Sequence, residues 1–134
     1  MKTELRYGII GAGSMGREHI ENIKVMGGAQ VTAISDPHGP SQEAALALAP
    51  GAKVFTDHRA LLDSGLVDAV VIATPNDTHA AVLKDALATD LAVFVEKPLA
   101  TTVEDLKSIL AWDEKRSAMT VSYTHLTLPT KRIV

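Results

Sequence analysis

The 134-residue chain contains no cysteine, which excludes disulfide bonds, thiolate chemistry and zinc sites built on thiolates. Aromatic residues make up only 4% of the sequence, so a core must be built mainly from Ala, Val, Leu and Ile. That composition suits helices packed on a buried parallel sheet. The length is typical of one domain.

No apolar run approaches the ~20 residues that a helix needs to span a bilayer, and no apolar signal segment precedes the first expected strand. The formal net charge is −3, and the sequence has no basic stripe of the kind that binds nucleic acid. No cluster of His, Asp and Glu has the spacing of metal ligands. We therefore expect a cytoplasmic protein without a membrane, nucleic-acid or metal partner.

Apolar runs alternate with helical patterns almost from the first residue. The runs predict strands at residues 7–10, 31–35, 53–55, 69–73 and 91–95, with another near Met119. Helices are predicted at 14–26, 41–49, 58–62, 77–88 and 101–113, the last opening with a capping box from Thr101 to Glu104. Strands that alternate with helices across short connections indicate an α/β fold, a doubly wound parallel sheet (Rossmann fold) in a single domain.

A glycine-rich turn joins the first strand to the first helix. The pattern G-x-G-x-x-G is weak by itself, but here a strand precedes it and a helix follows it. Gly11 permits the tight turn, Gly13 leaves room for a pyrophosphate, and Gly16 lets the helix approach the sheet. The diphosphate would sit on the free amides of the helix N-terminus, so the residues predicted to bind a dinucleotide here are Gly11, Gly13, Ser14, Met15 and Gly16.

Asp36 ends the second strand, 20 residues after Gly16. Its carboxylate can accept hydrogen bonds from the adenosine ribose and would repel a 2′-phosphate. Alternatively, Asp36 only caps the turn that runs from Pro37 to Pro40. No Arg or Lys lies within residues 34–45, so we predict NAD as the cofactor and NADP as the less favoured one.

Two further segments follow the fourth and fifth predicted strands, namely Thr74-Pro75-Asn76 with His79, and Glu96-Lys97-Pro98. With the glycine turn, their order and spacing resemble the Gfo/Idh/MocA family of sugar and cyclitol oxidoreductases over residues 5 to about 120. The resemblance implies that Thr74, Pro75 and Asn76 lie near the nicotinamide ribose. It implies that Lys97 is catalytic, contacting that ribose and the substrate hydroxyl, while Glu96 helps to position the cofactor.

Each histidine and the Glu-Lys pair also has a simpler interpretation. His79 matches a family histidine but could be a solvent-facing residue at a helix start, and Glu96 and Lys97 could form a surface ion pair. His19 is expected to pack or to lie on the helix surface. The remaining histidines considered, His38 and His58, fall in turns.

The resemblance ends before the last residues. Family members continue into a second domain that carries the general base, whereas the segment from Val121 to Val134 resembles the translated read-through of a transposon-derived sequencing adapter. A genuine, divergent strand and tail is the alternative. We expect a Rossmann domain at residues 1–120 and a non-native tail at 121–134, so Tyr123 and His125 are not catalytic candidates.

The resemblance implies an NAD-dependent dehydrogenase that acts on a sugar, polyol or cyclitol hydroxyl, and that forms a homo-oligomer at full length. These 134 residues are expected to be inactive alone. A non-catalytic NAD-sensing module is the alternative from another class, and it would not need Glu96, Lys97 and Pro98. A different Rossmann reductase, of the dihydrodipicolinate or homoserine type, is disfavoured by the segment from Thr74 to His79.

Overall fold

The computed structural model describes residues 4–96, 100–118, 120–123 and 131–132. For residues 122, 123, 131 and 132 it describes the backbone only. A seven-stranded sheet runs in the order β3-β2-β1-β4-β5-β6-β7. Its strands are β1 (Leu5–Ile10), β2 (Ala29–Ser35), β3 (Lys53–Phe55), β4 (Ala69–Ile72), β5 (Ala92–Glu96), β6 (Thr120–Tyr123) and β7 (Lys131–Arg132). The first six pair in parallel and β7 pairs antiparallel to β6, which confirms the predicted doubly wound Rossmann fold.

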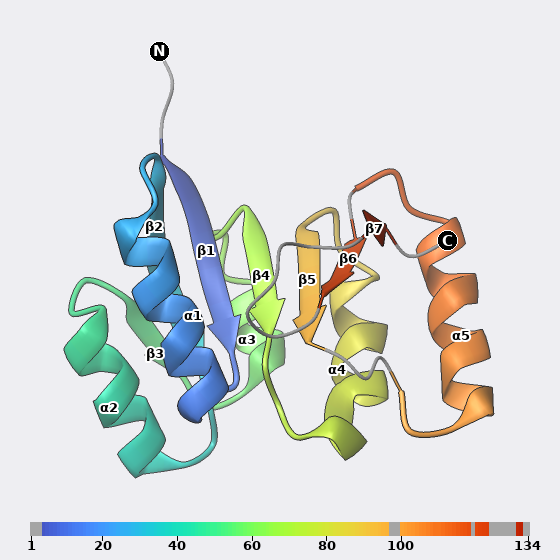
Figure 1. Cartoon of the computed structure of the whole chain (residues 1–134), viewed down its shortest axis with the longest axis horizontal. Coiled ribbons are helices and arrows are strands. Elements are labelled where there is room, and N and C mark those ends of the chain that lie inside the picture. The colour runs from blue at the N-terminus through green and yellow to red at the C-terminus, as the bar shows by residue number, and fades with distance from the viewer. Residues whose placement is uncertain (1–3, 97–99, 119, 124–130, 133–134) are drawn as a thin grey trace.

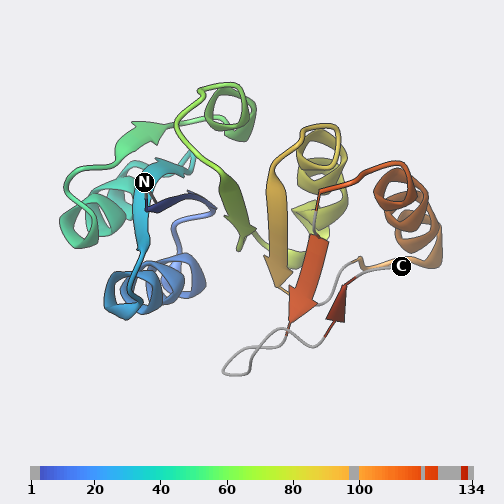
Figure 2. The same ribbon diagram turned by 90° about the horizontal axis from the view of Figure 1, so that it is seen from above.

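Helices cover both faces of this sheet (Figures 1 and 2). The helices α1 (Ser14–Val25) and α2 (Gly39–Leu48) lie together on one face. The other face carries α3 (His58–Leu62), α4 (His79–Ala86) and α5 (Val103–Glu114), with a 3-10 turn, η1 (Asn76–Thr78), before α4. Among the described residues, no helix is long and apolar enough to cross a membrane.

Alternation along the strands divides the buried residues between two cores, because successive side chains of a strand point to opposite faces. Ile9 and Val71 pack with Ile20 of α1 on one face. Ile10 and Ile72, each next in sequence, pack on the other face with α3, α4 and α5. Strands buried on both faces read as continuous apolar runs, which is why β4 was the clearest strand to predict.

The predicted elements are confirmed, with their ends shifted by a few residues. One local prediction was wrong: the N-cap of α5 is Thr102, whose side chain accepts a hydrogen bond from the amide of Asp105. The cap predicted at Thr101, with Glu104 completing a capping box, therefore lies one residue later, at Thr102. Either threonine satisfies a cap in sequence terms, and only the backbone path selects between them.

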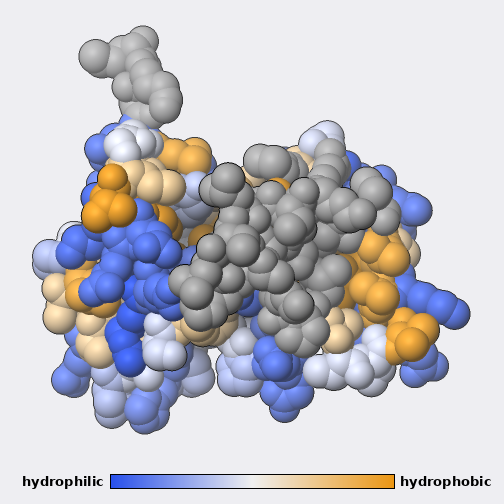
Figure 3. Space-filling model, viewed as in Figure 1, coloured by the Kyte–Doolittle hydropathy of each residue, from blue (hydrophilic) through white to orange (hydrophobic). Residues whose placement is uncertain are grey.

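Helix α5 leaves apolar side chains on the surface, visible at the right of Figure 3. Val103 is 68% exposed and Leu106 is 37% exposed, whereas Ile109 is fully buried. Leu110 and Trp112 also pack partly against the core. The helix is therefore anchored to the sheet through its second half.

Strand β6 crosses the boundary expected after residue 120. Thr120 pairs with Val93 and Val121 with Phe94 in parallel register, and Val121 is only 5% exposed. The origin of residues 121–134 stays a prediction. What the pairing adds is that Val121 contributes to the sheet whatever its origin.

Truncation therefore has an expected outcome that depends on where it falls. Removing residues 121–134 deletes most of β6 and exposes its neighbour, so we expect the melting temperature to fall by on the order of 10 °C. Removing only residues 124–134 keeps β6 whole and should change it by no more than a few degrees. Thermal unfolding followed by circular dichroism measures both, and equal losses from the two truncations would contradict the expectation.

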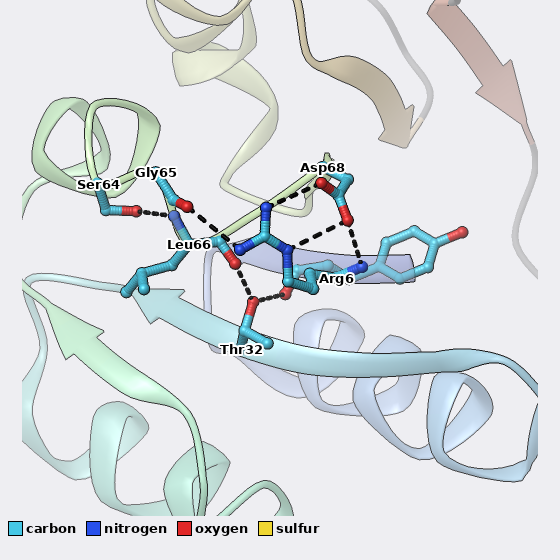
Figure 4. A network of polar contacts seen from close by, with 7 residues as sticks. Arg6, Thr32, Ser64, Gly65, Leu66 and Asp68 are labelled. Carbon is cyan, nitrogen blue, oxygen red and sulfur yellow. Dashed lines mark hydrogen bonds and ion pairs between the residues drawn. The ribbon is translucent and has the colours of Figure 1, made fainter. Parts of the chain in front are cut away.

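An ion pair joins Arg6 of β1 to Asp68, the residue just before the neighbouring strand β4 (Figure 4). The Arg6 guanidinium donates to both carboxylate oxygens of Asp68, with Nη2 to Oδ1 at 3.0 Å and Nε to Oδ2 at 3.3 Å, and the Arg6 amide donates to Oδ2 at 2.9 Å. Beside it, the Thr32 hydroxyl donates to the Leu66 carbonyl at 2.7 Å. The hydrogen bonds from Arg6 lower the pKa of Asp68 below its ordinary value of 3.8.

Acid should weaken this contact in a defined direction. A carboxylate whose pKa is lower in the folded chain contributes stability that is present above the unfolded pKa and is lost as the pH falls through the folded one. We expect Asp68→Asn to be slightly less stable at neutral pH. The difference should shrink as the pH falls below 3.8 and vanish once the pH is below the lowered pKa of folded Asp68. The effect is small because both side chains are about 40% exposed. Urea unfolding across this pH range measures it, and a difference that grows toward low pH would contradict the assignment.

Candidate dinucleotide-binding site

A cleft of about 600 Å³ opens at the carboxyl ends of β1, β2, β3 and β4, within the size range of small-molecule sites. It lies at the point where the strand order reverses. From β1 the chain continues outward through β2 and β3 on one side, and then returns to form β4 on the other side of β1. Ligands of open α/β sheets bind at such a switch point. Seven of the predicted site residues line the cleft: Gly11, Gly13, Ser14, Met15, Asp36, Thr74 and Pro75.

The three glycines of the turn have different surroundings. Gly11 has a φ of +101°, and a Cβ there would lie 2.6 Å from the carbonyl oxygen of Ala73. A Cβ on Gly16 would lie 1.8 Å from the carbonyl oxygen of Gly11. A Cβ on Gly13 would meet nothing within 4 Å. Gly11 and Gly16 are thus required by the chain itself, whereas Gly13 leaves open space on the cleft side.

Helix α1 begins at this turn without a side-chain cap. Gly13 is the N-cap residue, and the first turn of the helix contains no acidic residue. The amides at the start of a helix lack intrahelical partners, and the helix dipole places partial positive charge there. Ser14 and Met15 line the cleft, so this end of α1 is suited to hold an anion such as a diphosphate.

Asp36 joins the glycine turn to the end of β2. Its Oδ2 accepts a hydrogen bond from the amide of Ala12 at 2.7 Å, and its Oδ1 accepts one from the amide of His38 at 2.8 Å. The carboxylate therefore caps the following turn, as the simpler interpretation held. Each oxygen keeps further acceptor capacity, so the same carboxylate can accept from ribose hydroxyls. None of the cleft-lining residues in the described part of the chain is Lys or Arg.

The turn after β4 is supported by the buried side chain of His79. The imidazole is fully buried, and its Nε2 donates to the carbonyl oxygen of Thr74 at 3.0 Å. The solvent-facing interpretation of His79 is therefore wrong. Thr78 donates through its hydroxyl to the carbonyl of Pro75 at 2.6 Å, while Asn76 is exposed. His79 thus supports the turn from beneath, and Thr74 and Pro75 face the cleft.

Two buried hydroxyls lie at the cleft without a hydrogen-bond partner among the described residues, Ser35 Oγ and Thr74 Oγ1. Buried polar groups usually find a partner, so these atoms mark positions where a polar ligand or a water would be accommodated. With the open space at Gly13 and the uncapped amides of α1, they show that the cleft fits a dinucleotide. None of the described residues form a cluster of His, Cys, Asp and Glu that could hold a metal ion.

Glu96 and His19 meet in the interior. The His19 Nε2 forms a hydrogen bond with Oε2 of Glu96, and the residues are 9% and 7% exposed respectively. A surface ion pair made by Glu96 is therefore excluded, and His19 is more than a packing residue. The partner of Glu96 was missed because it lies 77 positions away. The spacing of three residues from Gly16 to His19 was the available signal, since it places both on one side of α1.

The remaining predicted residues have these positions. His38 is the N-cap of α2, where its Nδ1 accepts from the amide of Ser41 at 3.3 Å. His58 begins α3, lines the cleft and lies 2.7 Å from a carboxylate oxygen of Asp85 through its Nε2. Lys97, the predicted catalytic residue, lies outside the described residues, as does His125.

Comparison with known families decides the relationship. The model of the Gfo/Idh/MocA group, described as an oxidoreductase family with an NAD-binding Rossmann fold, matches residues 5–125. The chain belongs to this family. The match reaches five residues beyond the boundary expected at 120, and the family description names the NAD-binding Rossmann fold that the structure shows.

Two of the similar relatives are inositol 2-dehydrogenases. The chain is 47% identical over 97 residues to an inositol 2-dehydrogenase of Leifsonia xyli, covering 72% of this chain and 28% of that protein. It is 39% identical over 116 residues to an inositol 2-dehydrogenase of Corynebacterium glutamicum, covering 86% and 34%. The chain thus spans about a third of the length of the relatives that it matches.

Solved dehydrogenase structures superpose on the chain. The myo-inositol dehydrogenase of Lactobacillus casei, in complex with NAD(H) and myo-inositol, aligns with a TM-score of 0.84 and 37% identity over 91% of this chain and 36% of that one. The WlbA dehydrogenase of Bordetella pertussis, in complex with NADH and UDP-GlcNAcA, aligns with a TM-score of 0.83 and 29% identity, covering 90% and 37%. Two dehydrogenases solved with different bound ligands, myo-inositol in one and UDP-GlcNAcA in the other, therefore share the fold of this chain.

Proposed function

We propose that the chain is the NAD-binding domain of a dehydrogenase that oxidises a hydroxyl of a cyclitol, with a sugar or another polyol as the wider substrate class. The observation that carries this is the cleft at the switch point, where open space at Gly13 and an uncapped helix end face Asp36. The inositol 2-dehydrogenases among its relatives support the cyclitol.

In this proposal the cofactor, when bound, accepts a hydride at its nicotinamide ring, and the chain supplies position and charge. The amides at the start of α1 would hold the diphosphate, and Asp36 would hold the adenosine ribose. Thr74, Pro75 and Asn76 would hold the nicotinamide ribose. Lys97 would donate a hydrogen bond to the substrate hydroxyl and stabilise negative charge that develops there, as a compact cation can.

The NAD preference is tested at Asp36. A carboxylate accepts from a free ribose diol and repels a 2′-phosphate, and hydrogen bonds to charged groups contribute about 1.5–3 kcal/mol. We therefore expect NAD to bind about tenfold or more tightly than NADP, and Asp36→Ser to narrow the gap. Calorimetric titration of both cofactors measures it.

The matched control is Asp57→Asn, because Asp57 lines the same cleft and caps α3. It should change the ratio of the two affinities less than Asp36→Ser does, if the contact rather than the overall negative charge discriminates. Tighter binding of NADP by the unmodified chain would contradict the assignment.

A cytoplasmic location and assembly into a homo-oligomer stay predictions.

A further inference from the structure

We propose that His19 and Glu96 form a positioning pair that holds the phosphate-binding helix and the carboxyl end of β5 at a fixed separation. Glu96 then acts through His19 rather than as a ligand of the cofactor. This inference rests on the proposed dinucleotide binding and adds the role of two buried residues. Neither residue lines the cleft.

The strand sets the direction of the Glu96 side chain. Val93 and Val95 belong to the core beneath α4 and α5, whereas Phe94 packs with the core beneath α1. Because side chains alternate along a strand, Glu96 points to the same face as Phe94. Its carboxylate is therefore directed toward α1 and away from α4.

Helix α1 supplies the partner from its own buried stripe. Gly16, His19, Ile20 and Ile23 are the buried residues of α1, so His19 lies one turn beyond the glycine that lets the helix approach β1. In the sheet, β4 lies between β1 and β5. The contact of His19 with Glu96 therefore spans β4. It connects α1, which packs on β1, with the end of β5, a strand that is not a neighbour of β1.

Burial makes the contact between Glu96 and His19 important for stability. A buried carboxylate is costly unless it is hydrogen-bonded or paired, and removing one partner leaves the other unsatisfied. Glu96 and His19 are both more than nine-tenths buried. The pair thus has a strong reason to stay together, and any shift of α1 relative to β5 has to break it.

The bridge joins the two halves of the binding site. In the proposed mode of binding the start of α1 would face the diphosphate, and Glu96 is directly followed by Lys97. On the other side of the switch point, Asp36 and the residues after β3 line the cleft, where they would face the adenosine half. Helix α1 also packs on β1 through Ile20, so it should keep its place when the pair is lost, whereas the end of β5 loses its link to α1. Loss of the pair should therefore disturb binding of the nicotinamide half, while the adenosine and diphosphate contacts persist.

The test compares NADH with ADP as probes of the whole 134-residue chain. ADP contains the adenosine and the diphosphate but lacks the nicotinamide. We expect Glu96→Ala to weaken NADH binding about tenfold, the scale of one lost hydrogen bond to a charged group, and to change ADP binding by less than about twofold. Glu96→Gln keeps an acceptor for His19 and should restore most of the NADH affinity. Fluorescence titration of NADH and calorimetry of ADP give the two constants.

Coupling and stability provide the controls. The double variant His19→Ala with Glu96→Ala should bind NADH no more weakly than Glu96→Ala does, since both remove the same contact. Ile109→Ala destabilises the opposite core, where Ile109 is fully buried, and should leave the ratio of NADH to ADP affinity unchanged. If Glu96→Ala does not fold, His19→Ala removes the same contact from the other side, and Glu96→Gln stays the variant that keeps it.

Three results overturn the pair as a positioning device: parallel losses of NADH and ADP affinity, no loss of either, or additive losses in the double variant. Failure of the proposed function looks different, because the unmodified chain would then bind neither NADH nor ADP. The two hypotheses therefore fail on separate measurements.

Discussion

Replacing Gly13 with alanine is expected to abolish most of the NAD affinity while leaving the fold intact. A Cβ at this position meets nothing within 4 Å in the chain, and the φ of −73° is one that alanine adopts. Loss of a glycine N-cap costs no more than about 1 kcal/mol. The added methyl would occupy the side of the turn that the diphosphate approaches, so we expect affinity to fall about a hundredfold or more.

Gly16→Ala is the contrasting variant, because its methyl would collide with the chain rather than with a ligand. The Cβ would lie 1.8 Å from the Gly11 carbonyl oxygen, and helix and strand would have to separate. Overpacking of this severity costs about 3 kcal/mol or more. Urea unfolding and calorimetric NAD titration of both variants separate the two effects. An unchanged NAD affinity in Gly13→Ala would remove the diphosphate from this turn.

The elements and the cleft could be predicted because their signals are local in the sequence. The run Ala69–Ile72 is apolar at every position and forms a strand buried on both faces. The glycine turn specifies its own geometry, since Gly11 needs a positive φ and Gly16 a bare Cα. Asp36 follows at a distance fixed by one helix and one strand. Each inference needed only short-range spacing.

Contacts between distant residues could not be predicted in the same way. The pair of Glu96 and His19 spans 77 positions and the pair of Arg6 and Asp68 spans 62. Their meeting depends on which strands are neighbours and on how α1 crosses the sheet, and neither follows from periodicity. The burial of His79 was open for the same reason, because a histidine at a helix start can face either solvent or sheet. The predicted position of the α5 cap was wrong by one residue, because two adjacent threonines are equally good N-cap residues.

The second large effect expected is that the 134-residue chain binds NAD but catalyses no turnover. Binding needs the glycine turn, Asp36 and the turn at Thr74, which the structure brings to one cleft. Turnover also needs a base within hydrogen-bond reach of the substrate hydroxyl and walls that hold the reacting carbon against the nicotinamide. The chain spans only about a third of the inositol dehydrogenases that it resembles.

The described histidines offer no such base beside the nicotinamide. His19 and His79 are buried against Glu96 and the Thr74 carbonyl, and His38 caps α2. Asp57 and His58 line the cleft just after β3, which is the adenosine side in the proposed mode of binding. A lysine is a cation at neutral pH, so Lys97 can stabilise charge on the substrate oxygen but is a poor proton acceptor.

The measurement is NAD reduction, followed by absorbance, with inositols, sugars and other polyols at NAD concentrations that calorimetry shows to be saturating. We expect no NADH above the level given by the Gly13→Ala variant, which serves as the binding-deficient control. Steady NADH production by the unmodified chain that disappears in Lys97→Ala would show that the base and the substrate walls lie within these 134 residues. In that case a group within these residues would have to accept the hydroxyl proton, and the proposed division of labour between two domains would be wrong.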